Sequence, residues 1–307
     1  MLTATSKINM QESKDYFCTI YKIKYNDKYK REWEVKKDFS ETNPPVFVRT
    51  AYDFDDKSKC VKSIELDDEY RILPLPYIPL KSEQERSTIY ISGASGKGKS
   101  YLINEISEMY HALFPNNKLY FFTKNDWTED RSLNKDLYEF VDVDKFIEHY
   151  RTADMLKQFL LTKEFNNSFF IFDDIGALEK ISKEAAHTLQ TVIDIILENK
   201  RKAKVSIAIL SHIPTNYKKT SLLIREMKQY YLFPGNLQAK SDRIIDTYLG
   251  LSKKEIERIV DEDSVDTTWL CVDNERRIIF TQRQIYFLKS KKLEKKKPAK
   301  SRKRKNN

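Results

Sequence analysis

The sequence predicts an α/β protein with a mostly parallel sheet covered by helices on both faces, and two observations lead to this fold class. Strand and helix signals alternate along the chain after residue 86. The expected strands are continuous apolar runs, such as SFFIF at residues 168–172 and VSIAIL at residues 205–210. Strands of that kind are buried on both faces, as happens when crossover helices cover a parallel sheet.

The expected elements follow one another in a regular order. We expect strands at residues 87–92, 118–122, 168–172, 205–210 and 230–233. We expect helices at residues 100–113, 143–161 and 181–200, where apolar residues recur at helical spacing. A hairpin-like end is expected at residues 267–272 and 277–281.

Residues 1–80 differ from the rest because they contain almost no helical periodicity and no glycine. Short β-prone runs occur there at residues 16–25, 46–52 and 71–75. We therefore expect a small β-rich N-terminal module over residues 1–80. Pro74, Pro76 and Pro79 form a stiff connection to a larger domain over residues 81–288, because proline fixes its own φ and restricts the residue before it.

The positive charge of the chain is concentrated in residues 289–307. That segment has nine lysines, two arginines and one glutamate, which gives 11 − 1 = +10, whereas the whole chain carries +9. The remaining residues therefore sum to about −1. We expect a disordered basic tail over 289–307 that attracts polyanions. Its KPAKSRKRK run also resembles a nuclear-import signal, and a solubilising end without a specific partner remains open.

Composition excludes several other classes of protein. The three cysteines are widely spaced and form no CxxC pair, so neither a disulfide framework nor a zinc site is indicated. The longest apolar runs fall far short of the roughly 20 residues of a membrane span, and the N-terminus lacks the layout of a secretory signal. We expect an intracellular protein that is not secreted and has no membrane span.

The strand at 87–92 leads into a glycine-rich octet that matches the Walker A pattern GxxxxGK[ST]. Its members are Gly93, Ala94, Ser95, Gly96, Lys97, Gly98, Lys99 and Ser100. Backbone N–H groups of such a loop point at phosphates, a geometry that side chains would obstruct. Three of the six glycines in the chain lie in this octet. We expect it to bind ATP, with Lys99 on the β- and γ-phosphates and the Ser100 hydroxyl on Mg²⁺.

The run FFIFDD, about 80 residues further on, has the form of a Walker B motif. An apolar strand there delivers two carboxylates at its C-terminal end, where ligands bind in open α/β sheets. We expect Asp173 to hold Mg²⁺ and Asp174 to orient or deprotonate the attacking water. Ser211, at the end of the next strand, is our candidate for sensing the γ-phosphate, and His212 is a candidate for fixing the loop.

These motifs and the alternating elements predict the α/β fold of a P-loop nucleoside triphosphatase (NTPase) of the ASCE, RecA-like type. Four segments also resemble the viral genome-packaging ATPases of the poxvirus, giant-virus and virophage type, within the FtsK/HerA superfamily. They are ISGASGKGKSYLINEISEMYHALFPNNKLYFFT, SFFIFDDIGAL, ILENKRKAKVSIAILSH, and KKTSLLIREMKQYYLFP followed by YLGLSKKEIERIV. The resemblance spans roughly residues 85–285.

The resemblance adds expectations that the residues alone do not give. It implies that Arg201 is an arginine finger reaching the ATP of a neighbouring subunit in a homo-oligomeric ring. It implies an ATP-hydrolysing double-stranded DNA translocase that packages a viral genome into a preformed capsid, with capsid or portal-vertex proteins as partners. Its expected place is the virus factory or nucleus of an infected host, or the virion.

Three alternatives remain open at this stage. The first is a related FtsK/HerA-type DNA pump or helicase not involved in packaging. The second is a small-molecule kinase, which would need a lid domain and an acceptor pocket. The third is a nucleotide-binding scaffold without turnover, which would require a damaged loop or missing acids.

Overall fold

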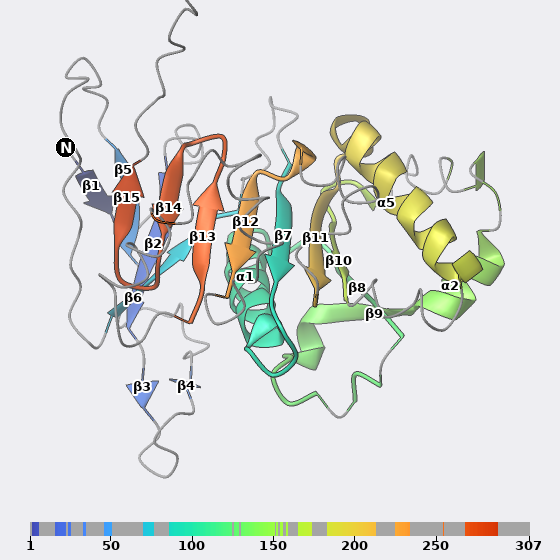
Figure 1. Ribbon diagram of the computed structural model, residues 1–307, viewed down its shortest axis with the longest axis horizontal. Coiled ribbons are helices and arrows are strands. Elements are labelled where there is room, and N and C mark those ends of the chain that lie inside the picture. The colour runs from blue at the N-terminus through green and yellow to red at the C-terminus, as the bar shows by residue number, and fades with distance from the viewer. Residues whose placement is uncertain are drawn as a thin grey trace, which may run out of the picture.

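The computed structural model describes residues 2–5, 16–22, 24–25, 33–34, 46–50, 70–76, 86–124, 126–128, 130–150, 152, 154–155, 158, 165–173, 183–212, 225–233, 254 and 268–287. Its larger sheet consists of β7 (Thr88–Ser92), β8 (Leu119–Thr123), β9 (Tyr138–Asp142), β10 (Phe169–Phe172), β11 (Ser206–Ser211), β12 (Gln229–Leu232), β13 (Leu270–Asp273), β14 (Ile278–Phe280) and β15 (Ile285–Phe287). The order across the sheet is β15-β14-β13-β12-β7-β11-β10-β8-β9 (Figure 1).

Six neighbouring strands of this sheet, from β12 to β9, run parallel to one another. Strands β13, β14 and β15 extend the sheet in antiparallel fashion beyond β12. The strand predictions at residues 87–92, 118–122, 168–172, 205–210 and 230–233 are therefore confirmed, as is the mostly parallel sheet.

Different helices cover the two faces of the larger sheet. Side chains of a strand alternate between the faces, and the two hydrophobic clusters follow this alternation. Ile89 and Ile91 of β7 pack with α1 (Lys99–Leu113), so we call this side the α1 face. Tyr90 of β7 belongs to the cluster of α5 (Lys183–Ala203) and α2 (Val143–His149), which defines the α5 face.

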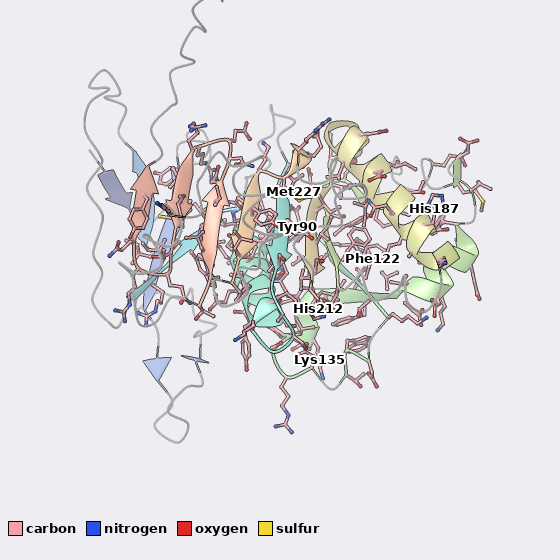
Figure 2. All side chains as sticks on the ribbon, in the orientation of Figure 1. Tyr90, Phe122, Lys135, His187, His212 and Met227 are labelled. Carbon is pink, nitrogen blue, oxygen red and sulfur yellow. The ribbon has the colours of Figure 1, made fainter. Side chains whose placement is uncertain are left out.

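Helix α5 fits its expected apolar stripe. The five residues that the spacing places inward are 0–2% exposed: Leu189, Val192, Ile193, Ile196 and Leu197. They pack against aromatic side chains of the sheet on the α5 face, including the stacked pair Phe122 and Phe172, whose ring centroids lie 4.6 Å apart. Figure 2 shows Phe122 between the strands and the helix that carries His187.

The helix expected over residues 143–161 is interrupted at Tyr150. Helix α2 ends at His149, and Tyr150 leaves the helical conformation with φ −109° and ψ 66°. Met155, which the spacing places inward, is 42% exposed. The prediction that Met155 faces inward is therefore wrong, whereas the other inward candidates beyond residue 150, Phe159 and Leu160, lie outside the described residues. Asp142 begins α2, because its carboxylate accepts hydrogen bonds from the N–H groups of Asp144 and Lys145.

A second, antiparallel sheet is formed by the N-terminal region. Its strands are β1 (Leu2–Thr5), β5 (Val46–Thr50), β2 (Tyr16–Lys22) and β6 (Tyr70–Pro74), in that order across the sheet. β3 (Lys24–Tyr25) pairs separately with β4 (Trp33–Glu34). The expectation that this region is rich in β-strands is confirmed.

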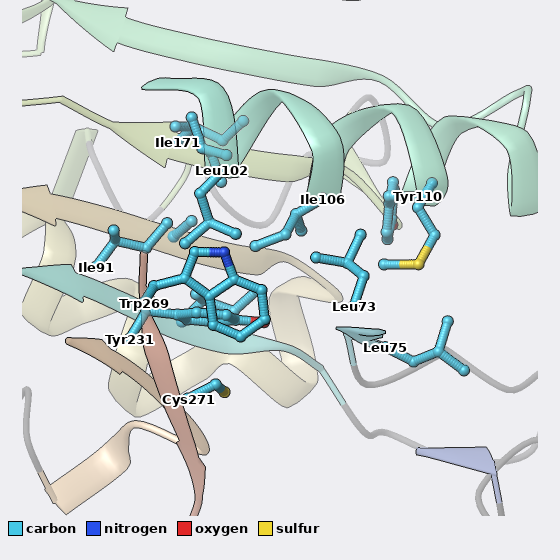
Figure 3. Packing of buried hydrophobic residues seen from close by; sticks show 14 of the residues in the cluster. Leu73, Leu75, Ile91, Leu102, Ile106, Tyr110, Ile171, Tyr231, Trp269 and Cys271 are labelled. Carbon is cyan, nitrogen blue, oxygen red and sulfur yellow. The ribbon is translucent and has the colours of Figure 1, made fainter. Parts of the chain in front are cut away.

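The small sheet packs on the α1 face of the larger one. The Ile72 N–H donates a hydrogen bond of 2.7 Å to the carbonyl oxygen of Gln282. Leu73 and Leu75 belong to the same buried cluster as Leu102 of α1 and Trp269 (Figure 3). The N-terminal strands and the larger sheet therefore share a hydrophobic core.

No helix within the described ranges combines the length and the apolarity that a membrane crossing requires. The expected basic tail at residues 289–307 lies outside the described part of the chain.

Candidate nucleotide-binding site

The candidate site lies where the central parallel strands end. The register pairs Ser92, the last residue of β7, with Ser211 at the end of β11 and with Leu232 at the end of β12. Asp173 follows directly after β10, the strand beside β11. In open α/β sheets ligands bind at this carboxyl edge. The structure thus brings the two Walker segments to one edge of the sheet.

Two glycines of the octet have backbone conformations that require glycine. Gly96 has a φ of 72° and Gly98 a φ of 99°, in the left-handed region that residues with a Cβ rarely adopt. Gly98 precedes α1, and its carbonyl oxygen accepts the first helical hydrogen bond, from the Leu102 N–H at 3.0 Å. The loop therefore turns directly into the amino end of a helix, whose unpaired N–H groups favour a bound phosphate.

The first glycine of the octet is required for a different reason. A Cβ on Gly93 would lie 2.7 Å from Cδ2 and 3.0 Å from Cγ of Phe233, well inside van der Waals contact. Phe233 follows β12, is 3% exposed, and its ring also lies 3.9 Å from a Cβ placed on Gly98. Both ends of the loop therefore rest on one aromatic ring, a contact that the sequence motif does not indicate.

Lys99 is buried inside the loop, with 7% of its surface exposed. Its Nζ donates hydrogen bonds to the carbonyl oxygens of Gly93, at 2.9 Å, and Ala94, at 3.2 Å. It also lies 3.0 Å from Nδ1 of His212. An ammonium group is a donor only, so His212 Nδ1 accepts this bond and must be unprotonated. The loop thus holds a positive charge where the phosphates of a nucleotide are expected.

Ser211 and His212 have different surroundings. Ser211 lies opposite Ser92 on the α5 face, and its side chain forms a hydrogen bond with Tyr90. Burial raises the pKa of the Tyr90 hydroxyl to about 12, although that bond opposes the shift. The Ser211 carbonyl oxygen accepts a 3.1 Å bond from the Gly93 N–H. The structure therefore brings the imidazole of His212, and the backbone of Ser211, to the phosphate loop.

The other octet residues surround this lysine. Ala94 and Gly98 are half-buried, whereas Ser95, Gly96 and Lys97 are exposed. Ser100 occupies the first turn of α1 and is half-buried. An exposed loop above a buried ammonium leaves the backbone accessible to a polyanion.

Two residues have the donor atoms that Mg²⁺ prefers. Ser100 offers a hydroxyl and Asp173 a half-buried carboxylate, both hard oxygen ligands. The Asp173 N–H donates a 2.9 Å bond to the carbonyl oxygen of Phe122, which fixes the backbone at the end of β10. The described residues contain no group of three or more His, Cys, Asp and Glu residues suited to a metal ion. The donor set fits Mg²⁺, which keeps waters and phosphate oxygens in its shell and needs few protein ligands.

Two expected site residues are not placed by the structure. Asp174 lies outside the described residues, immediately after Asp173. Arg201 lies in the last turn of α5, but its side chain is outside the described part of the chain. Their roles remain predictions.

Strand order defines the class of fold. β11 lies between β7, which carries the phosphate loop, and β10, which carries Asp173. A glycine-rich loop between a buried parallel strand and a helix is the arrangement of a P-loop NTPase fold, and this strand order agrees with the ASCE, RecA-like type expected from the sequence. The fold class expected from the sequence is confirmed.

No family model matches the chain. Among curated proteins, it is 24% identical over 199 residues to the uncharacterized protein V3 of Sputnik virophage, spanning 64% of this chain and 75% of that protein. It is 26% identical over 156 residues to the chromosomal replication initiator protein DnaA of Crocosphaera subtropica, spanning 48% of this chain and 33% of DnaA.

The chain is also similar to several solved structures. One is the genome packaging NTPase B204 of Sulfolobus turreted icosahedral virus 2 in complex with ATP-gammaS, at 16% identity and a TM-score of 0.43, covering 64% of this chain and 97% of B204. Another is the type VII secretion ATPase EccC of Thermomonospora curvata, at 15% identity and a TM-score of 0.44, covering 73% of this chain and 28% of that one. A viral protein thus occurs in each of the two comparisons.

Proposed function

We propose that this chain is an ATPase of the FtsK/HerA type that moves double-stranded DNA, and that its task is to package a viral genome into a preformed capsid. The observation that carries the ATPase proposal is the buried ammonium of Lys99, held by loop carbonyls at the amino end of α1. The packaging task rests on the resemblance of the motifs, and the virophage relative supports it.

The chemistry follows from the position of each group. Lys99 and the loop N–H groups would bind the β- and γ-phosphates, and Ser100 and Asp173 would hold Mg²⁺. A bound Mg²⁺ would neutralise charge that develops on the phosphoryl oxygens. Asp174, two residues beyond the end of β10, would orient or deprotonate the attacking water. Because the two aspartates are consecutive, the carboxylate of Asp173 can face the metal while that of Asp174 faces the water.

Completion of the site by a second subunit is part of the proposal. Arg201 lies in the last turn of α5, shortly before β11 begins at Ser206. An arginine delivered to the phosphoryl transition state in trans raises the rate by about 10³–10⁵. We therefore propose a homo-oligomeric ring. Mixing tests it: Arg201→Ala subunits and Lys99→Ala subunits, each inactive alone, should restore hydrolysis together, and inactivity at every ratio would contradict a trans role.

Partners and boundaries are proposed on the same basis. Double-stranded DNA is the proposed track, with residues 289–307 as an added electrostatic contact. Capsid or portal-vertex proteins are the proposed docking partners. We propose residues 81–288 as the ATPase domain and residues 1–80 as the N-terminal module, active in an infected cell or on the virion.

Phosphate release from ATP, with and without linear duplex DNA, tests the function. Hydrolysis that duplex DNA stimulates strongly is the expected result. Lys99→Ala should abolish it, whereas Lys118→Ala, an exposed lysine beside β8 that pairs with Glu139 at 2.9 Å, should not. Asp174→Asn should still bind ATP but fail to turn it over. A rate of ATP hydrolysis that does not change when duplex DNA is added would contradict the proposal that the chain is a DNA motor.

A related DNA pump outside packaging is the second candidate, because the strand order and loop do not distinguish the two. A forked duplex separates a helicase from a packaging motor, since packaging does not require strand separation. Co-purification of the full chain with capsid proteins from infected cells supports packaging, and its absence favours the pump.

A further inference from the structure

Three acceptors from the described residues lie within hydrogen-bond distance of the Lys99 ammonium. Two are the carbonyl oxygens of Gly93 and Ala94, at 2.9 and 3.2 Å. The third is Nδ1 of His212, at 3.0 Å. An ammonium group has three hydrogens, so a phosphate that bonds to Lys99 competes with these acceptors for them.

The three acceptors differ in how easily each can move away from the Lys99 ammonium. Gly93 is fixed through its N–H, which donates to the Ser211 carbonyl oxygen at 3.1 Å, and through the Phe233 ring against its Cα. The Ala94 carbonyl belongs to the same loop. His212 is instead an exposed side chain with two rotatable bonds, one residue past the end of β11. Rotation about these bonds moves the imidazole away from Lys99 without a change in the loop backbone. The two carbonyl oxygens can move away from Lys99 only if the loop backbone moves.

We propose that His212 is a nucleotide-displaced latch: its Nδ1 holds Lys99 when the loop is empty and gives way to a phosphate oxygen when nucleotide binds. This inference rests on the proposed nucleotide binding at the loop. It assigns His212 a positioning role that acts through Lys99. Figure 2 shows His212 beside the start of α1, far from His187 on α5.

The latch has a measurable consequence because it competes with the ligand. A phosphate oxygen that replaces His212 on Lys99 must break the hydrogen bond between these two residues. A net hydrogen bond in a protein corresponds to roughly a two- to tenfold change in an equilibrium constant. His212→Ala should therefore bind ADP and ATPγS roughly two- to tenfold more tightly than the natural chain. A residue that only supports the fold would have the opposite effect, since its loss would weaken binding.

The experiment is isothermal titration of the full chain with ADP and with ATPγS. His212→Asn keeps an acceptor one bond from Cγ, as Nδ1 is, and should bind with nearly the natural affinity. His187→Ala is the matched control, because it removes an exposed histidine from α5. His187→Ala should leave the affinity unchanged if the latch is the imidazole of His212.

A spectroscopic measurement reports the latch without relying on affinity. The chain has four histidines, so a long-range ¹H–¹⁵N spectrum resolves each ring. The ring missing from the His212→Asn spectrum should show an unprotonated, hydrogen-bonded Nδ1 in the empty protein. That signal should shift when ATPγS is added.

The outcomes separate the two proposals. Tighter binding by His212→Ala, retained affinity in His212→Asn and a shifted Nδ1 signal establish the latch. Nucleotide binding that is unchanged or weaker in His212→Ala overturns the latch while leaving the nucleotide site intact. Tighter binding of the same size in His187→Ala also overturns it. Nucleotide binding by neither the natural chain nor His212→Ala refutes the site, and the latch with it.

Discussion

Replacement of Gly93 by alanine tests whether the Phe233 ring shapes the phosphate loop. The added methyl would lie 2.7 Å from Cδ2 and 3.0 Å from Cγ of that ring. Carbon atoms prefer separations of about 3.5–4.0 Å, so the overlap approaches 1 Å against a ring that is 3% exposed. Overpacking of this kind costs about 1–3 kcal/mol. Gly93→Ala should therefore lower the free energy of unfolding by that amount and weaken ATPγS binding.

The overlap should disappear when the ring is removed. Phe233→Ala alone leaves a cavity and costs about 3–5 kcal/mol. In the double variant, the atom of residue 233 nearest the new methyl is Cβ, at 3.2 Å, which a shift of a few tenths of an ångström relieves. The double variant should therefore be less destabilised than the sum of the single variants, by about 1–3 kcal/mol.

Gly96→Ala provides the matched control within the same loop. A Cβ there meets nothing within 4 Å, but the φ of 72° remains strained for alanine. Its effect should add to that of Phe233→Ala within about 0.5 kcal/mol. Urea unfolding and ATPγS titration of the single and double variants measure both couplings. Additive effects of Gly93→Ala and Phe233→Ala would refute the argument that the ring excludes a side chain at residue 93.

Further predictions concern pH and charge. Burial raises the pKa of Tyr90 from 10.0 to about 12, so the folded protein binds more protons than the unfolded chain between these values, and stability falls as pH rises from 10 to 12. The loss at pH 12 should be about 2 kcal/mol. A smaller loss is expected in Tyr90→Phe, and tyrosinate absorbance that rises fully below pH 11 without unfolding would contradict the prediction. Burial also raises the pKa of Asp194, whose Oδ1 accepts a 2.9 Å bond from Gln190, so its charged form opposes folding above that pKa. Asp194→Asn should stabilise the protein against urea at pH 7, and the gain should shrink as the pH falls toward 3.8, where the carboxyl of the unfolded chain is also protonated. Deletion of residues 289–307 should weaken duplex DNA binding and flatten its salt dependence, because fewer counterions are released, and an unchanged salt slope would leave the tail as a targeting or partner signal.

Local patterns predicted the central elements of the fold well. The apolar runs that became β10 and β11, and the stripe that became α5, are signals contained within single elements. β9 was not expected because it lies at the edge of the sheet, where only Tyr138 of its five residues is buried and the apolar signal is weak. β15 is short and also lies at an edge. Edge strands carry less of the burial that makes a strand recognisable.

The site was predictable in part. The octet motif locates Lys99 and the glycines, because the groups that bind phosphate come from consecutive residues of the chain. The contact between Gly93 and Phe233 joins residues 140 positions apart, each directly after a strand, and these two strands become neighbours only in the folded sheet. No spacing rule connects them. The sequence does offer one signal, since Phe233 ends the strand predicted at residues 230–233 at the same edge as the loop.

The assignment of Ser211 and His212 depends on which face of the sheet each side chain occupies. Both residues lie at the end of one predicted strand, so their sequence position alone does not separate them. Pairing of Ser211 with Ser92 places its hydroxyl on the side of Tyr90, away from α1. The next residue then falls on the α1 face, where the loop folds back over the sheet.

The phosphate loop is therefore fixed by both strands that flank β7. From β12, the Phe233 ring supports Gly93 and approaches Gly98. From β11, the Ser211 carbonyl holds the Gly93 N–H, and the His212 ring holds Lys99. Of these contacts, only the one through His212 competes with a phosphate for the same hydrogen atom. If nucleotide binding alters the sheet edge, the change must begin at His212, because the backbone and aromatic contacts can persist unchanged in the loaded loop.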